Sequence, residues 1–158
     1  MRHSKPEVAD EAACKRTALD LLARREHSRV ELTRKLAARE FPAELIAATL
    51  DQLEQSGALA EARFTETFIR SRVAKGQGPL RIRAELAQRG VAEAEVDTLL
   101  RNAEVDWVAM TRAARQKRFG GAPPRDYPDR ARQARFLEYR GFNSAQVRAA
   151  LELDADSD

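Results

Sequence analysis

Residues 64–91 read FTETFIRSRVAKGQGPLRIRAELAQRGV and contain the densest apolar pattern in the chain. In the first half of this segment, apolar residues recur at helical spacing, which predicts an amphipathic helix. These residues are Phe64, Phe68, Ile69 and Val73. Gly76-Gln77-Gly78 predicts the end of that helix. Pro79 suits the first position of a second helix, because the N–H that proline lacks is not needed there.

The second half of the segment predicts that second helix. Ile82 and Leu86 lie one turn apart and form its apolar seam. Arg89-Gly90 predicts its end, because a basic residue favours the last turn of a helix and glycine adopts the left-handed conformation that often follows. The whole segment is therefore expected to form a helix, a glycine loop and a helix.

The part of the chain before this segment has a related pattern. A first helix is expected to begin near Glu11 and to bury one stripe of side chains. That stripe consists of Cys14, Ala18, Leu19 and Leu22. Ser28 with Glu31 three residues later is a capping-box pattern, which predicts a second helix that runs through Ala38. Pro42 predicts the start of a third helix.

These patterns repeat with a period of about 50 residues. One shift of this size superposes Cys14 on Phe64 and Leu36 on Leu86. A further shift superposes Leu86 on Leu137, whereas the first helices of the second and third copies align only with gaps. A period of this length with three helices in each unit is typical of helical arrays, in which each unit contacts mainly its neighbours.

Two positions depart from the repeat. The first copy has Glu40 where the later copies have Gly90 and Gly141, and the third copy has Gln133 where the second has Ile82.

The fold class that follows is all-α, an elongated tandem array of three three-helix repeats without a shared central core. Leu36, Leu86 and Leu137 are expected to be among the most buried residues of their repeats. The predicted divisions are a flexible N-terminal tail (1–10), repeat 1 (11–57), repeat 2 (58–103), repeat 3 (104–152) and an acidic C-terminal tail (153–158).

The composition of the 158 residues agrees with a helical protein and leaves the partner open. The net charge of +3, from 28 Lys and Arg against 25 Asp and Glu, is too small to indicate a partner by itself. The one cysteine, Cys14, excludes an intramolecular disulfide and falls on a core position, which favours a buried thiol over a reactive one. No apolar run approaches the ~18 residues of a membrane span, so a cytoplasmic protein is expected.

The sequence offers no set of residues suited to catalysis. His3 and His27 have no second ligand or nucleophile at a useful spacing, so neither an enzyme nor a metal site is expected. Gly76-Gln77-Gly78 lacks the Lys-Ser/Thr of a phosphate-binding loop and no strand precedes it, so a helix connection is the better interpretation. No cofactor and no small-molecule substrate are expected.

Several motifs together resemble the RecX family of bacterial recombinase regulators. The central ones are Phe68-Ile69-Arg70-Ser71-Arg72, Gly78-Pro79-Leu80-Arg81-Ile82, Glu85-Leu86 and Arg89-Gly90-Val91. On either side, SRVELTRKL from Ser28 to Leu36, Arg135-Phe136-Leu137 and Arg140-Gly141-Phe142 support the match. The resemblance covers roughly residues 12–151, with Phe136 standing where the second copy has Glu85.

The resemblance implies tandem three-helix repeats that bind the filament of the recombinase RecA on DNA. It also implies inhibition of strand exchange, of ATP hydrolysis and of the coprotease role of the filament. The expected partner is therefore the RecA filament, with weak binding to single- or double-stranded DNA also possible, and no membrane.

Basic residues gather in the second and third copies and are the candidates for contact with a partner. They are Arg70, Arg72, Lys75, Arg81, Arg83, Arg89, Lys117, Arg118, Arg135 and Arg140. Such strips suit an acidic protein surface or phosphates, and charge alone does not separate the two. The alternative function is therefore a helical-repeat protein that binds DNA through its phosphates without a RecA target.

Four further side chains have competing interpretations. The helical spacing of Phe64 and Phe68, together with Trp107 at the start of the third copy, favours core packing over stacking on single-stranded DNA. Arg72 falls at the edge of the predicted core, so its charge needs a partner, and Glu85 on the next helix is the expected one.

Overall fold

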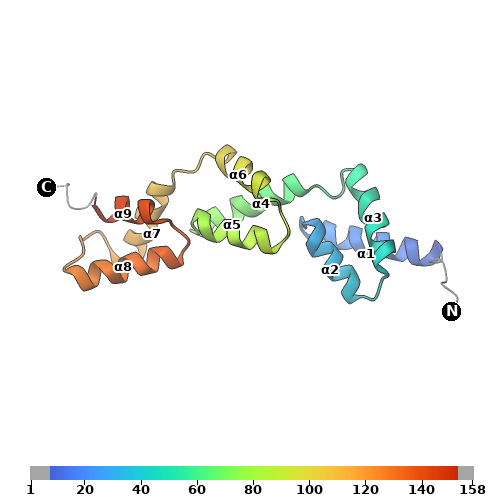
Figure 1. Cartoon of the computed structure of the whole chain (residues 1–158), viewed down its shortest axis with the longest axis horizontal. Helices are drawn as coiled ribbons and strands as arrows, with labels where there is room; N and C mark the ends of the chain where they lie inside the picture. The colour runs from blue at the N-terminus through green and yellow to red at the C-terminus, as the bar shows by residue number, and fades with distance from the viewer. Residues whose placement is uncertain (1–7, 153–158) are drawn as a thin grey trace.

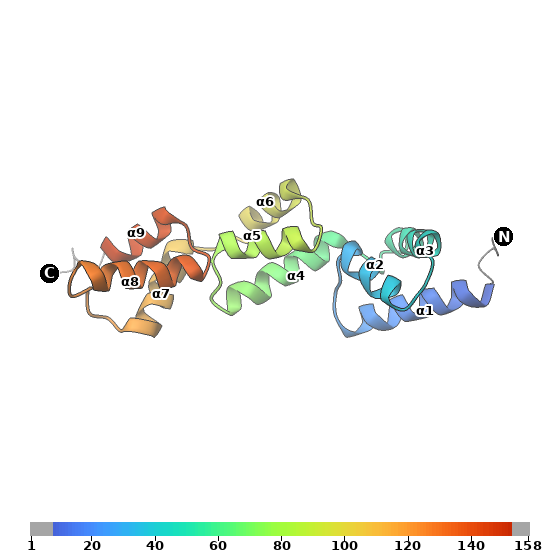
Figure 2. The ribbon, with the colours of Figure 1, turned by 60° about the horizontal axis from the view of Figure 1, so that its bottom comes forward.

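The computed structural model describes residues 8–152, which form nine α-helices and no β-strand. Three consecutive helices make up each repeat, and the three repeats lie in a row along the longest axis of the molecule (Figures 1 and 2). The predicted all-α array is therefore confirmed. The helices are α1 (Val8–Arg24), α2 (Arg29–Ala38), α3 (Ala43–Gln55), α4 (Glu61–Ala74), α5 (Pro79–Gln88), α6 (Glu93–Asn102), α7 (Trp107–Phe119), α8 (Tyr127–Tyr139) and α9 (Ser144–Glu152).

Each repeat buries its own hydrophobic cluster. Leu36, Leu86 and Leu137 are each 0% exposed, in three separate clusters, as the repeat pattern predicted. Trp107 is partly buried against both the second and the third cluster, so it connects two repeats. Cys14 is fully buried in the first cluster, as expected.

The buried stripe of α1 differs from the predicted one. Cys14, Ala18 and Leu21 are buried, whereas Leu19, which was predicted to be buried, is 39% exposed. The three buried residues follow i, i+4, i+7 spacing, and Leu19 lies about 100° around the helix from Ala18. The spacing of Cys14, Ala18, Leu19 and Leu22 also fits a helical stripe, so the prediction was wrong about which face packs on the core. The equivalent of Leu19 in repeat 2, Ile69, is buried in α4. The first helices of the two repeats therefore present different faces to their cores.

Helix α1 also begins earlier than predicted, at Val8 and thus inside the segment 1–10 assigned to a tail. The rest of that tail and the acidic segment 153–158 lie outside the described residues.

The N-terminus of α2 is capped within its own repeat, as predicted. The Ser28 Oγ accepts the Glu31 N–H at 3.1 Å, and the Glu31 carboxylate accepts the Ser28 N–H at 3.2 Å. This reciprocal pair satisfies two of the backbone donors that a helix N-terminus leaves open.

The N-terminus of α5 has no side-chain cap and is instead capped by the next repeat. The Gly78 N–H donates to the Arg140 carbonyl at 2.8 Å, and the Leu80 N–H donates to the Gly141 carbonyl at 2.9 Å. Because Arg140 and Gly141 lie at the end of α8, the N-terminus of α5 meets the carbonyl end of α8, and the two helices lie almost in line (Figure 2). We call this contact the α5–α8 joint.

The contact between repeats 1 and 2 uses the same places in the repeat but different groups. Val30, near the start of α2, packs against Gly90 in the turn between α5 and α6, where an added Cβ would lie 2.2 Å from the Val30 Cγ2. The Arg34 guanidinium donates to the Gln88 carbonyl at 3.1 Å. Repeats 1 and 2 are therefore joined by the packing of Val30 on Gly90, whereas repeats 2 and 3 are joined by backbone hydrogen bonds at the α5–α8 joint.

The position of Glu40 in the first described repeat explains why this turn has glutamate where the later repeats have glycine. The turn between the second and third helix has a left-handed residue in every repeat: Glu40 with φ 68°, Gly90 with φ 78° and Gly141 with φ 101°. A Cβ at Gly141 would lie 2.4 Å from the Arg81 Cβ, so glycine is needed where the preceding repeat packs against the turn. Glu40 belongs to the first described repeat and is exposed, so its side chain meets no such neighbour.

Substitution of a central leucine should destabilise the repeat that contains it. Leu36→Ala, Leu86→Ala or Leu137→Ala should each lower the free energy of unfolding by roughly 2–5 kcal/mol, because each leaves a cavity in a small core. Urea denaturation followed by circular dichroism would measure this loss. Leu19→Ala is the matched control and should cost less than half as much, since Leu19 is 39% exposed. Equal costs at all four positions would contradict the assigned faces.

Alanine should have different effects at the three left-handed turns. Gly90→Ala and Gly141→Ala should each cost more than the roughly 1–2 kcal/mol of left-handed strain alone, because the new Cβ also displaces the preceding repeat. Glu40→Ala should leave the melting temperature nearly unchanged, since it replaces one L-residue by another. If Gly141→Ala were as mild as Glu40→Ala, the close approach at the α5–α8 joint would not be required for stability.

Candidate functional site

The candidate basic residues divide into two groups, those that make contacts within the fold and those that extend into solvent. Arg72 and Arg81 belong to the first group, since both pair with Glu85, with N–O distances of 3.0 and 3.3 Å. The pair of Arg72 and Glu85 was predicted and is confirmed, although its geometry is that of an ion pair rather than an aligned hydrogen bond. Both side chains of this pair are only 21% exposed, so the charges meet at the core edge of repeat 2.

Phe68 brings two of these arginines together. The guanidinium carbons of Arg72 and Arg89 lie 4.6 and 4.7 Å from the centroid of its ring, within the range of cation–π attraction. Arg89 also donates to the Glu85 carbonyl at 3.0 Å. Phe68 therefore packs partly against the core and partly under arginines, which agrees with core packing rather than base stacking.

Two further candidates are also engaged within the fold. Arg83 forms an ion pair with Asp97 on α6. Arg140 reaches across the α5–α8 joint and donates to the Lys75 carbonyl at 3.1 Å. Neither side chain is therefore free to bind a partner without loss of a contact inside the molecule.

The second group consists of five exposed basic residues, for which no ion pair is recorded between residues 8 and 152. They are Arg70, Lys75, Lys117, Arg118 and Arg135. The guanidinium carbon of Arg118 lies 5.7 and 5.8 Å from the ring centroids of Phe119 and Phe136, within the range of cation–π attraction, and the residue is exposed. We call these residues the outward basic set; two lie at α4 and its C-cap, two in the last turn of α7 and one on α8.

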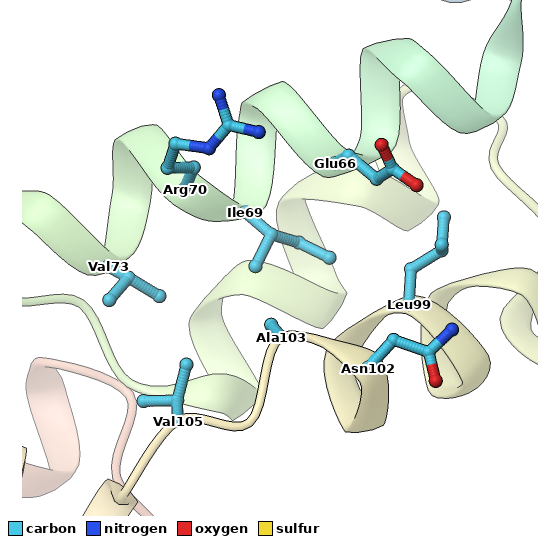
Figure 3. A pocket seen from close by; sticks show the side chains of 8 residues that line it. All are labelled: Glu66, Ile69, Arg70, Val73, Leu99, Asn102, Ala103 and Val105. Atoms are coloured by element: carbon cyan, nitrogen blue, oxygen red, sulfur yellow. The ribbon is translucent and has the colours of Figure 1, made fainter.

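A shallow groove lies beside the first of them, between α4 and the end of α6. Ile69 and Val73 point from α4 toward Leu99 and Val105, and Arg70 lies at the rim (Figure 3). The lining is mostly apolar, and its few polar groups do not converge on one point. The groove can therefore accept an apolar side chain, but it carries no arrangement for bond chemistry.

The histidine in the described part of the chain has a structural environment. His27 is 1% exposed, with Nδ1 3.0 Å from the Arg25 carbonyl and Nε2 2.8 Å from the Lys35 Nζ. Burial lowers the pKa of His27, and the neutral ring can donate to the carbonyl and accept from the lysine. Within residues 8–152, no three side chains of His, Cys, Asp or Glu gather as they would around a metal ion.

Repeat 3 contains a buried polar network that the sequence patterns missed. Arg115 is 2% exposed, and it donates to the Gln133 Oε1 at 2.8 Å and to the Ala122 carbonyl at 2.6 Å. Burial lowers the pKa of Arg115. Gln133 stands where repeat 2 has Ile82, so a hydrogen-bonded pair replaces an apolar contact. The one signal of this network in the sequence was Gln133, a polar residue at a position where the repeat pattern expects an apolar one.

Asp129 anchors the start of α8 beside that network. Its carboxylate accepts the Arg125 N–H at 3.0 Å and the Arg132 guanidinium at 2.9 Å. The hydrogen bond from the Arg125 N–H, followed by the one from Arg132, lowers the pKa of Asp129 to about 2. Asp129 is therefore ionised near neutral pH and holds Arg132 on the exposed side of α8.

Comparison with known proteins gives three matches to family models along the chain. They are described as the first, second and third three-helix domains of RecX and match residues 14–53, 61–100 and 104–151. A regulatory protein RecX of Pseudomonas entomophila is 53% identical over 135 residues, which cover 85% of this chain and 87% of the relative. One of Halorhodospira halophila is 52% identical over 138 residues, which cover 87% and 86%.

Two solved structures have the same fold. A crystal structure of RecX from Lactobacillus salivarius matches with a TM-score of 0.79 and 16% identity, over 93% of this chain and 97% of that one. A crystal structure of a regulatory protein RecX matches with a TM-score of 0.77 and 20% identity, over 90% and 72%.

The stability of repeat 3 should depend on pH through Asp129. Its pKa is about 2 in the folded protein against 3.8 for a free side chain, so the unfolded state binds the proton more readily. The stabilisation from this group should be complete above about pH 4 and should fall as the pH drops toward 2. Urea denaturation at a series of pH values would show this slope. Asp129→Asn should be less stable near neutral pH and should lack that part of the slope; an unchanged slope would contradict the assignment.

Proposed function

Because the chain belongs to the RecX family, we propose that it is a negative regulator of RecA, which binds the RecA filament on DNA. It inhibits the recombinase, ATPase and coprotease activities of the filament in the cytoplasm, and it does so by binding rather than by catalysis. The name regulatory protein, which the relatives carry, supports a regulatory role for this chain. No helix within residues 8–152 is long and apolar enough to cross a membrane.

The observation that carries this proposal is the outward basic set, because it is spread over two similar repeats of an elongated array. A filament presents identical subunits at regular intervals, so a row of similar repeats can contact several of them at once. Contacts that are weak one by one then add through effective concentration. A regulator lodged in the groove of the filament in this way would hinder the rearrangement of neighbouring subunits.

The alternative is a protein that binds DNA through phosphates alone, using the same residues. Ion pairs within the fold reduce the positive charge available to bind phosphates, because Arg72, Arg81 and Arg83 already have carboxylate partners. Phosphate binding through the outward basic set would weaken linearly in a plot of log affinity against log salt, and equally for bare DNA and filament.

Charge reversal in the outward basic set should abolish inhibition while the protein stays folded. The first variant is Arg70→Glu/Lys75→Glu in repeat 2, and the second is Lys117→Glu/Arg135→Glu in repeat 3. Each should weaken inhibition of RecA-driven strand exchange by more than about tenfold, since loss of one repeat also removes the gain in effective concentration. The defect should increase with salt concentration, because screening weakens the contacts that remain.

Lys15→Glu/Arg39→Glu in repeat 1 is the matched control, since it changes the net charge equally at one helical and one C-cap position. This control should inhibit like the parent protein. Circular dichroism would first establish that all three variants are folded. Equal inhibition by the parent and both test variants would refute the proposed surface. Parallel loss of affinity for bare DNA and filament would favour the phosphate-binding alternative.

A further inference from the structure

Two exposed apolar side chains from different repeats lie close to the α5–α8 joint. Leu80 on α5 is 52% exposed and Tyr139 on α8 is 77% exposed. The Leu80 N–H is bonded to the carbonyl of Gly141, two residues after Tyr139. The guanidinium carbon of Arg81 lies 5.8 Å from the centroid of the Tyr139 ring. These contacts place Leu80, Arg81 and Tyr139 on one continuous surface.

The fold does not use the side chain of Leu80. Its equivalent in repeat 1 is Val30, which packs against Gly90 and holds the contact between repeats 1 and 2. At the α5–α8 joint, the backbone N–H of Leu80 and the Cβ of Arg81 approach Gly141 instead. Leu80 thus keeps 52% of its surface exposed at the place where Val30 makes a contact between repeats.

Tyr139 is a large aromatic residue where the other repeats have smaller side chains. The equivalent residues at the ends of α5 and α2 are Gln88 and Ala38, and both are exposed. Isolated apolar residues on a surface are ordinary, but two large ones that flank the same joint between repeats suit a contact surface. Tyrosine and arginine are also the residue types that contribute most to binding energy in protein interfaces.

The border of this surface is mainly basic. Arg135 is exposed one turn before Tyr139, and Arg81 is partly exposed beside the ring. Lys75 is exposed, and its carbonyl is tied to the end of α8 through Arg140. Glu138 is the exposed carboxylate next to them. A complementary partner would therefore offer an apolar pocket with carboxylates at its edge.

We propose that Leu80 and Tyr139 together insert into an apolar pocket, bordered by carboxylates, on a protein partner. The inference rests on the proposed function, in which that partner is the protein component of the filament. A protein pocket fits better than nucleic acid, because burial of a leucine requires apolar surface that a phosphate backbone does not present. The contact distinguishes the filament from bare DNA.

The test compares two tyrosines on one helix. Tyr127 lies at the other end of α8 and is 81% exposed, so Tyr127→Ala is the matched control for Tyr139→Ala. Fluorescence anisotropy of labelled protein would measure binding to RecA filaments assembled on single-stranded DNA, and separately to the same DNA alone. Leu80→Ala and Tyr139→Phe complete the set, and the melting temperature of each variant should match that of the parent.

Tyr139→Ala should weaken filament binding by about tenfold or more, because tyrosine is among the residues that dominate interface binding energy. Leu80→Ala should weaken it by several-fold, because less apolar surface is then buried. Binding to bare DNA should stay unchanged, and Tyr139→Phe and Tyr127→Ala should bind the filament like the parent. If the parent binds but Tyr139→Ala binds equally well, the inference fails while the proposed function stands. A parallel loss on bare DNA would instead indicate base stacking and would also overturn it. A parent protein without affinity for the filament would refute the proposed function and this inference with it.

Discussion

The hydrogen bonds at the α5–α8 joint are the interaction on which the rest of the structure depends. They satisfy the N-terminal donors of α5 with carbonyls that lie about 60 residues away in the sequence, and so join repeats that have separate cores. They require glycine at positions 78 and 141, because a Cβ on either would overlap the opposite backbone or Arg81. They also bring Leu80 and Tyr139 close to the same joint. One backbone contact thus determines how repeats 2 and 3 are joined, why glycine stands at the joint and which surface is offered to a partner.

The small size of the cores also means that contacts within the fold and contacts with a partner compete for the same arginines. Repeat 2 has a short hydrophobic cluster, and arginines whose charges need partners lie at its edge. Glu85 accepts two of them, and Phe68 lies beside two. Only the basic residues beyond this edge remain available for other molecules. An arginine-rich sequence therefore overstates the basic surface, since part of its charge stabilises the fold.

Most of the helix pattern followed from the sequence because it rests on local interactions. The capping box of Ser28 and Glu31, the start of α5 at Pro79 and the buried leucines are read from spacings of a few residues. The prediction for Leu19 was wrong because apolar spacing within α1 does not determine which of two overlapping faces packs on the core. The network of Arg115 and Gln133 was missed because Arg115 lies on the first helix of the third copy, which aligns with the second copy only with gaps, so no repeat position marked Arg115 as buried.

What the sequence determined by itself is the all-α array of three similar units, because apolar periodicity and helix caps are properties of short segments. It also supplied the pair of Arg72 and Glu85, since a charge at a core edge needs a partner on the next helix. The tertiary structure alone decided which basic side chains face solvent and which apolar ones lie close to the α5–α8 joint. Those outcomes depend on how whole helices approach one another, and a spacing within one helix contains no information about the distance to a neighbouring repeat.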